Sequence, residues 1–525
     1  MRPSLWRWGT AALVAAVFVT RLPLATGTLY AFDSANYALA VRDRYNVAFH
    51  QPHPPGYPLY VAVAWVINLA AHDANRALVF EGVLLSAVAV GCTVGVARAL
   101  YGRTAGLLAG LLLLFTVGFW GYGEVAYPYV GLAAELASLA LLAHGTLAGH
   151  RRLALALGAV WALALGIRWD GAVFGSLLCL WALWAVSWRL RAGAVAIALA
   201  IVAAWVIPMV QLTGGPTAYL QAVNVYLHVW GPQSAFVVGD APTGGGTQAT
   251  YNLNFFVNYT RQMLGVGVLL VFYAVGKRFG PASLAADYRS RFLLLWSLPP
   301  IGVYLFSHLG EAGYVLSLAP QAATLAAVSI LDLGDEARTL AATLRWRDPR
   351  WLPAMRWLPA GLVTVLTLAI VGWNIQAFVR GAGPGRLPDL RAHDATTSAQ
   401  VAFLGQQPPG ATLVLAHDIL RQVQFYLPGQ PVALLYSEYV PGWESVRERT
   451  DLPAGTRQVV VLDSPLEVPP ADAGRVREVV VHEQPRATVW VVDVQGARAV
   501  EHGYRYLHVL PDVAEHETPP RTVRL

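Results

Sequence analysis

Long apolar runs recur along the first 380 residues of the chain and are separated by short polar loops. A helix needs about 20 apolar residues to cross a bilayer, and eleven runs approach that length. We therefore predict a mainly α-helical, polytopic membrane protein. The predicted spans lie near 6–24, 77–99, 104–120, 125–147, 153–168, 171–188, 192–213, 262–276, 291–308, 314–333 and 357–379.

Composition supports the membrane assignment and narrows the chemistry. Charged residues make up 13% of the chain and hydrophobic residues 56%, against roughly 25% and 45–50% in soluble domains. Cys92 and Cys179, the two cysteines, both lie in apolar runs, which argues against a disulfide framework or a cysteine zinc site. Lys277 is the single lysine, so anion binding falls mainly to arginine, histidine or a metal.

Basic residues fall in alternate loops, which orients the spans because cytoplasmic loops are enriched in arginine and lysine. The basic residues behind the net charge of +6 thus indicate the topology of the chain rather than a nucleic-acid-binding surface. The pattern requires that the apolar stretch 55–72 lies in the outer leaflet without crossing. The N-terminus is then cytoplasmic, with run 6–24 a signal anchor (a cleaved signal peptide is the alternative), and the C-terminal region is external. The basic loops contain Arg98 and Arg103, Arg151 and Arg152, Arg189 and Arg191, Lys277 and Arg278, Arg289 and Arg291, and 336–351.

This orientation places a set of polar residues on the outer side of the membrane. Ionisable groups at membrane depth are costly and usually line a cavity or a pathway. We therefore predict one polar site at the outer mouth of the bundle. Its candidate residues are Asp33, His50, His53, Tyr57, Glu124, Tyr127, Arg168, Asp170, His308 and Glu311.

The first outer loop, 25–76, carries two of the motifs. Asp33 opens a predicted interfacial amphipathic helix, in which Tyr37, Val41 and Tyr45 share one face; capping of that helix is the alternative role for Asp33. The stretch "HQPHPPGYPLY" cannot be helical through its prolines. It predicts a rigid bend that holds His50 and His53, the alternative being a stiff connector with solvated histidines.

Three further motifs each have a structural alternative. "FWGYGEVAYPY" places Glu124 at a helix start, where a carboxylate also suits the helix dipole. "GIRWDG" puts Arg168 and Asp170 in a short hairpin, where a local salt bridge is the alternative. "SHLGEAGY" puts His308 and Glu311 in a tight turn.

The remaining segments set the predicted domain boundaries. Residues 214–260 predict a long outer loop, either a mobile lid over the site or a plain connector. Residues 1–380 form the membrane domain and 381–400 a linker. Residues 401–525 predict a small extracytoplasmic α/β domain, because β-type runs recur at 411–416, 431–436, 457–463, 477–483 and 488–494.

Taken in order, "FDSANYA", "HPPGYPLY", "YGEVAYPY", "GIRWDG" and "HLGEAGY" resemble motifs of the GT-C superfamily of polytopic glycosyltransferases. The likeness covers roughly 6–333 and is nearest to the protein O-mannosyltransferases, the lipid A aminoarabinose transferase and the bacterial family-39-like branch with an HPPGYP motif. It implies a polyprenyl-phosphate sugar donor, transfer on the outer side of the membrane, and Asp33 at the catalytic centre.

Two departures from the family pattern matter for the mechanism. Family members often have a second acidic residue after the first, where this chain has Ser34, so use of a divalent cation (Mg or Mn) stays open. Some members bring a lysine to the lipid phosphate near the bend, where this chain has His53 and Pro54. Arg168 is then our candidate for contacting the phosphate.

We predict a glycosyltransferase of the cell (plasma or inner) membrane that moves a sugar from a polyprenyl-phosphate donor to an acceptor hydroxyl. Asp33 would be the general base, and a cation would stabilise the leaving phosphate. The acceptor, a protein, lipid or glycan, is not readable from the sequence. A transporter or flippase of a lipid-linked intermediate, and a sensor with a ligand-binding tail, are the alternatives; polar residues through the membrane and repeated broken helices would favour transport.

Overall fold

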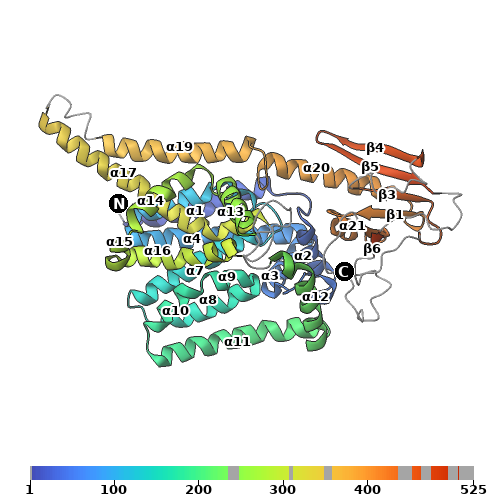
Figure 1. The fold of residues 1–525 in the computed structure, drawn as a ribbon, viewed down its shortest axis with the longest axis horizontal. Coiled ribbons are helices and arrows are strands. Elements are labelled where there is room, and N and C mark those ends of the chain that lie inside the picture. The colour runs from blue at the N-terminus through green and yellow to red at the C-terminus, as the bar shows by residue number, and fades with distance from the viewer. Residues whose placement is uncertain are drawn as a thin grey trace. The chain divides into compact units, whose positions relative to one another are not determined.

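A computed structural model describes residues 3–234, 248–306, 311–347, 357–435, 452–462, 474–494 and 506–507. Helices make up nearly all of the described chain before residue 404, and a sheet follows them (Figure 1). This confirms the predicted mainly α, polytopic fold with a small C-terminal α/β region. By its internal contacts the chain divides into two compact units. We call Met1–Ala25, Val79–Ala204 and Ala235–Asp389 the bundle unit, and Thr26–Leu78, Trp205–Ser234 and Leu390–Leu525 the mixed unit.

Six helical segments within the described residues are long and apolar enough to cross a membrane. Two of the predicted spans are instead interrupted, at 115–116 and at Gly175, and the predicted total of eleven crossings stays a prediction. The six segments are Ala74–Tyr101 (α4), Tyr129–Leu147 (α7), Trp188–Leu212 (α11), Thr250–Arg278 (in α13 and α14), Ala312–Thr343 (η4 and α17) and Leu358–Arg380 (α19). Other helices of the bundle are α1 (Pro3–Arg21), α5 (Arg103–Leu114), α6 (Val117–Gly121), α8 (Leu153–Ile167), α9 (Trp169–Phe174), α10 (Ser176–Trp184), α15 (Pro281–Ala286) and α16 (Tyr288–Phe306).

Helix α3 (Pro58–Ala71) is the segment that the orientation argument required not to cross. Its 14 residues are fewer than the roughly 20 that a crossing needs. Val63, Val66 and Leu69 are exposed along one side of it, with Trp65 beside them, as in a helix lying in an interface. Helices α5 and α8, in predicted spans, are similarly short, with 12 and 15 residues. The length of α3 therefore does not decide whether it crosses, and the sidedness of the loops stays a prediction.

The structure corrects the expectation of a long outer loop at 214–260. Helix α12 (Pro216–Ser234) fills its first part, and α13 (Gln248–Leu264) extends through its last part. The sequence already held one cue, because Pro216 follows two glycines and proline is well suited to the first helical position. Residues 235–247 lie outside the described part. Helix α20 (Leu387–Leu404) likewise fills most of 381–400, so that segment is helical rather than irregular.

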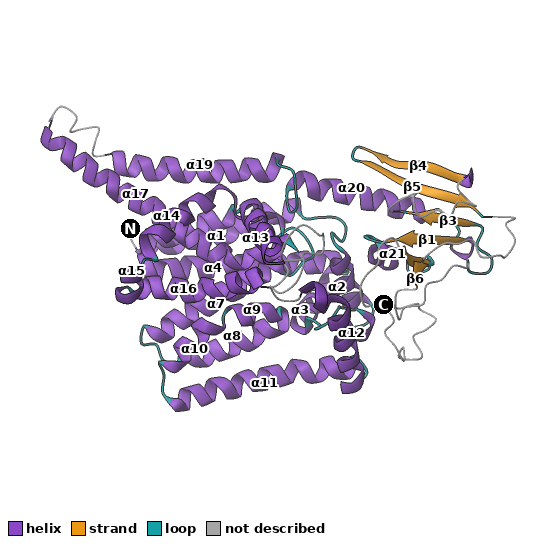
Figure 2. Ribbon diagram, in the orientation of Figure 1, coloured by secondary structure: helices purple, strands orange, loops and turns teal. Residues whose placement is uncertain are grey.

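A six-stranded mixed sheet forms the core of the C-terminal region, with strand order β4-β5-β3-β1-β2-β6 (Figure 2). The five predicted strands are all present, and the short β6 (Tyr506–Leu507) was not predicted. Alternate residues of β1 enter apolar clusters on opposite faces, Val414 on one and Leu413 on the other. The other strands are β2 (Val432–Leu435), β3 (Gln458–Val461), β4 (Val476–Glu483) and β5 (Arg486–Asp493), and β1 is Thr412–Ala416. The domain boundaries 1–380 and 401–525 stay predictions.

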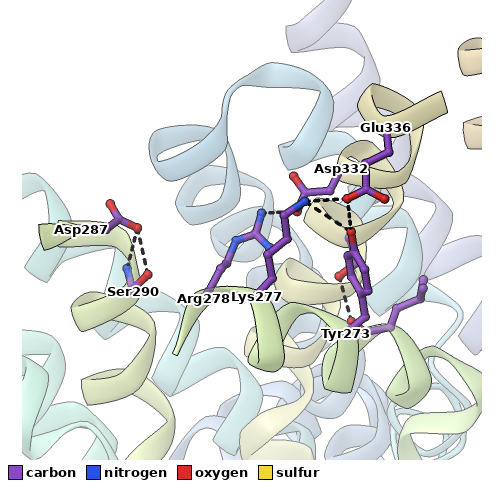
Figure 3. A network of polar contacts seen from close by, with 9 residues as sticks. Tyr273, Lys277, Arg278, Asp287, Ser290, Asp332 and Glu336 are labelled. Atoms are coloured by element: carbon purple, nitrogen blue, oxygen red, sulfur yellow. Dashed lines mark hydrogen bonds and ion pairs between the residues drawn. The ribbon is translucent and has the colours of Figure 1, made fainter. Parts of the chain in front are cut away.

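Two of the basic residues predicted to be cytoplasmic are paired with acidic residues of α17 (Ala319–Arg347) in the bundle unit (Figure 3). Lys277 Nζ lies 2.9 Å from Glu336 Oε1, and an Arg278 guanidinium nitrogen lies 2.5 Å from Asp332 Oδ2. Tyr273 Oη donates to Glu336 Oε1 at 2.7 Å. These contacts link α14 (Val268–Arg278) to α17. The exposed Lys277–Glu336 pair contributes about 0–1 kcal/mol, whereas the side chains of Arg278 and Asp332 are only 14% and 21% exposed.

Candidate active site

Asp33 is the second residue of α2 (Phe32–Arg42), not its cap. The cap is Ala31, whose N–H donates to Ser34 Oγ at 3.1 Å. One turn along the helix, Asn36 Nδ2 donates to Asp33 Oδ1 at 3.2 Å. The capping alternative for Asp33 is therefore wrong, and its carboxylate is held from the side by Asn36.

Helix α2 is enclosed rather than interfacial. Its residues from Ser34 to Val41 are all buried, and it packs against α3 and α21 (Leu420–Tyr426). Three alanines, at 35, 38 and 40, keep its surface small enough for neighbours on several sides. The prediction that α2 is an interfacial helix with one side toward lipid was wrong. The face that carries Tyr37 is buried, and so are the other faces between Ser34 and Val41.

The bend that follows α2 is non-helical through its prolines, as predicted, and hydrogen bonds hold it at both ends. Asn46 and Gln51 exchange backbone hydrogen bonds of 2.6 and 3.0 Å, and Tyr45 Oη donates to Gly56 O at 2.6 Å. His50 and Tyr57 both adopt left-handed backbone conformations, with φ of 53° and 46°. Helix α3 then begins at Pro58.

His53 is turned from this bend toward Asp33. Its Nδ1 lies 3.2 Å from Asp33 Oδ1, and its Nε2 lies 3.2 Å from Tyr57 Oη. The Tyr226 ring stacks on the imidazole with centroids 5.9 Å apart. Since the His53 side chain is only 10% exposed, the alternative of a solvated histidine is wrong. The structure thus brings Asp33, His53 and Tyr57 together, with the Asp33 side chain 32% exposed.

His50 belongs to the same unit and has a different electrostatic role. Burial lowers the pKa of His50 to about 3, with the charges of Arg421 and His53 adding to the effect and Asp33 opposing it. His50 is therefore a neutral imidazole at physiological pH. It can form hydrogen bonds but brings no positive charge to a phosphate.

Arg421, on α21, is a residue that the sequence gave no reason to select. Its Nε donates to Asn36 Oδ1 at 2.6 Å, and one terminal nitrogen donates to Phe49 O and His50 O at 2.9 and 3.1 Å. Gln424 Oε1 also accepts a hydrogen bond from Arg421 Nη1 at 2.6 Å. The partners in α2 and the bend precede Arg421 by hundreds of residues, and only its place after a predicted strand was readable.

In the bundle unit, Arg168 and Asp170 form the local salt bridge foreseen as the structural alternative. Arg168 Nε lies 3.0 Å from Asp170 Oδ1, and both side chains are buried. The rings of Tyr129 and Tyr314 face the guanidinium at 4.2 and 4.7 Å, a favourable cation–π arrangement.

Glu135 lies beside this pair and was not among the predicted residues. It is buried, and a Cβ added to Gly171 would lie 1.6 Å from its Oε2. Glycine at position 171 is therefore what lets the Glu135 carboxylate approach the Arg168–Asp170 turn. Its position in the middle of the apolar helix α7 was the only available signal.

Glu124 is fully buried in the turn between α6 and α7. Helix α7 begins five residues later, at Tyr129, and has no acidic residue in its first turn, so the helix-dipole alternative for Glu124 is wrong. The rings of Tyr127 and Tyr129 lie edge to face, 4.6 Å apart. Glu311 is exposed at the start of the short helix η4 (Ala312–Leu318), and His308 lies outside the described residues.

The described residues around Asp33 do not form a three-ligand site for a divalent cation. In the part of the chain that the structure describes, no group of three His, Cys, Asp or Glu side chains is close enough to hold a metal ion. Asp33 has His53 and Asn36 beside it rather than a second carboxylate. These described side chains do not fit a divalent cation, and the use of one stays a prediction.

Comparison with known proteins decides the fold. No protein-family model and no curated protein sequence matches the chain. Among solved structures, ArnT from Cupriavidus metallidurans bound to undecaprenyl phosphate superposes with a TM-score of 0.58 at 14% identity, over 95% of this chain and 100% of that chain. Its apo form gives 0.57 at 14% identity, over 93% and 98%. The chain has the GT-C fold. The likeness to an Archaeoglobus fulgidus oligosaccharyltransferase is weaker, with a TM-score of 0.45 at 10% identity over 88% of this chain and 69% of that one.

Proposed function

We propose that this membrane protein is a glycosyltransferase that moves a sugar from a polyprenyl-phosphate donor to an acceptor hydroxyl at the outer face of the membrane. The observation that carries the proposal is the cluster of Asp33, His53 and Tyr57, in which a partly exposed carboxylate lies 3.2 Å from an imidazole. The shared fold supports it, because ArnT has been crystallised with undecaprenyl phosphate. The outer-face assignment rests on the distribution of basic loops.

In the proposed reaction Asp33 is the general base. Its carboxylate accepts the acceptor's hydroxyl proton as that oxygen bonds to the anomeric carbon. The bond between the anomeric carbon and the phosphate oxygen breaks in line, and the polyprenyl phosphate leaves with the electron pair. Asn36 orients the carboxylate through the 3.2 Å hydrogen bond, and His53 faces the same oxygen.

The leaving phosphate needs positive charge or hydrogen-bond donors where its charge develops. Arg168 remains our proposed partner, with Glu124, Tyr127, Asp170, His308 and Glu311 as proposed substrate-binding residues. The 3.0 Å pair with Asp170 offsets part of the Arg168 charge. His50, being neutral, would contribute at most a hydrogen bond.

The test is sugar transfer by the purified protein in lipid nanodiscs. The donors would be undecaprenyl-phosphate sugars labelled in the sugar, offered with a panel of hydroxyl acceptors: peptides, lipid A-like lipids and envelope glycans. We expect labelled product with at least one acceptor and release of undecaprenyl phosphate in equal amount. Translocation of the intact donor in proteoliposomes without bond cleavage would contradict the proposal and favour a flippase.

A further inference from the structure

Residues from the C-terminal region hold the chain directly before Asp33. Both carboxylate oxygens of Asp394, on α20, accept backbone N–H groups, from Gly27 and Thr28, each at 2.9 Å. The N–H of Leu29 donates to Tyr426 Oη at 2.9 Å. All of these residues belong to the mixed unit. The entry into α2 is thus fixed by side chains nearly 400 positions later.

The same region holds the chain after Asp33 through Arg421. This side chain is 1% exposed, and its planar fork reaches α2 and the bend at the same time. Toward α2 it donates to Asn36, which in turn donates to Asp33; toward the bend it donates to the carbonyls of Phe49 and His50. A lysine has no such fork, so only arginine can make these bonds together.

An apolar contact completes the attachment. Phe32, the neighbour of Asp33, packs on the core formed by α20, α21 and one face of the sheet. The ring of Phe425 lies 4.2 Å from the guanidinium carbon of Arg42, at the far end of α2. Both ends of α2 are therefore anchored on the C-terminal region.

From these contacts we infer that Arg421 is a positioning residue for Asp33. We infer further that the C-terminal α/β region holds in place the segment 27–53, which carries Asp33 and His53. The inference rests on the proposed function for its catalytic consequence. Through Asn36, Arg421 would orient the Asp33 carboxylate. Its positive charge would stabilise the ionised form of that carboxylate.

The electrostatics agree with this geometry. Burial lowers the pKa of Arg421 to about 9, and Asp33 acts in the opposite direction, so Arg421 is still a cation at neutral pH. Because the interaction is mutual, the cation also favours the carboxylate form of Asp33. Among the described residues, the titratable groups near Asp33 include His53, at 3.2 Å, and His50, which is neutral.

The test compares Arg421→Met and Arg421→Lys with Arg486→Met. Arg486 is a matched control because it lies in the same sheet region, where it makes an exposed pair with Glu478. We expect Arg421→Met to lower kcat about 10-fold to 100-fold, to change KM for the donor little, and to move the acidic limb of the pH–rate profile to higher pH. Arg421→Lys should keep the limb near its wild-type position and still lower kcat. A normal profile and kcat in Arg421→Met would overturn the inference.

Two further measurements cover misfolding and a failure of the proposed function. If Arg421→Met does not fold, Asn36→Ala takes its place, because it removes the link from Arg421 through Asn36 to Asp33 while leaving the two bonds from Arg421 to the bend. This variant should also move the acidic limb of the pH–rate profile to higher pH. An unmoved limb in Asn36→Ala would count against the inference. If the wild-type protein transfers no sugar, the proposed function fails separately. Hydrogen exchange then decides: Arg421→Met should speed exchange of the amides in 31–36 and 46–53, and unchanged exchange relative to Arg486→Met would overturn the inference.

Discussion

Nδ1 of His53 lies 3.2 Å from Oδ1 of Asp33, although one residue sits in a proline-rich bend and the other in the first turn of a helix. The bend holds the His53 imidazole beside Asp33 because both ends of the bend are fixed by hydrogen bonds. The Asp33 carboxylate can accept a proton, and the His53 imidazole beside it can take up that proton or balance the charge of the carboxylate. This pair is the centre of the proposed activity.

Asp33→Asn should lower sugar transfer by roughly 10²–10⁴-fold, since an amide cannot accept the hydroxyl proton. Stability should change little, because Asp33 is not the cap of α2. Asp43→Asn is the control, an exposed acidic residue that pairs with Arg42 and whose loss should leave turnover unchanged. Near-normal transfer by Asp33→Asn, at an unchanged melting temperature, would remove it from the mechanism.

His50 should make the protein more sensitive to acid. The native state keeps His50 neutral down to about pH 3, whereas the unfolded chain takes up a proton below about pH 6.5. The unfolded state then binds more protons between these values, so stability is complete above pH 6.5 and is lost as pH falls. His50→Asn, whose side chain tolerates the left-handed backbone, should show a smaller drop in Tm between pH 7.5 and 5 than wild type. Parallel curves would contradict this assignment.

Removing one member of the Arg168–Asp170 pair should be more harmful than removing both. Asp170→Asn leaves a buried guanidinium without its carboxylate partner, at a cost of about 3–5 kcal/mol. The double variant Arg168→Met/Asp170→Leu should recover most of that stability. Asp335→Asn, which breaks an exposed pair with Arg338, is the control and should cost less than about 1 kcal/mol.

Sugar transfer by the double variant then separates structure from catalysis. If Arg168 contacts the donor phosphate, transfer stays low after stability is restored. Recovery of transfer together with Tm would show that the pair is only structural and would exclude Arg168 from the phosphate site.

Gly56→Ala should destabilise the bend and lower activity. The residue has a φ of +121°, and an added Cβ would lie 2.6 Å from Tyr45 Oη and 2.9 Å from Met209 Sδ. Gly215→Ala is a matched control in the same unit, with φ of +97° and nothing within 4 Å of the added atom. Backbone strain of about 1–3 kcal/mol applies to both. A larger loss of Tm for Gly56→Ala is expected from the clash, and equal losses would show that the bend relaxes around it.

The orientation can be tested with single cysteines in a variant lacking Cys92 and Cys179. Asp43→Cys and Arg338→Cys both occupy exposed positions in loops predicted to lie on opposite sides. A membrane-impermeant maleimide should label Asp43→Cys in intact cells and Arg338→Cys only after permeabilisation. Labelling of both cysteines from the same side would return 55–72 to the membrane as a full crossing, and the reverse pattern would invert the whole topology.

Several features were determined by local sequence alone. The apolar runs, the five main strands and the proline-rich bend were readable, because period and backbone restriction act over a few residues. Asp33, His53 and Tyr57 were selected for the same site from motifs in one short region. The sequence misled where a helix had no strong signal, as at 216–234, and where burial on all sides removed the expected polar face of α2.

Only the tertiary structure decided which polar groups meet. Arg421 and Asn36 are separated by 385 positions, and Glu135 approaches the Arg168–Asp170 turn because a glycine leaves room for it. A buried donor or acceptor must find a partner, but its own sequence neighbourhood does not say which one. That choice is made when segments distant along the chain pack together, and here it placed a side chain of the C-terminal region behind the proposed catalytic carboxylate.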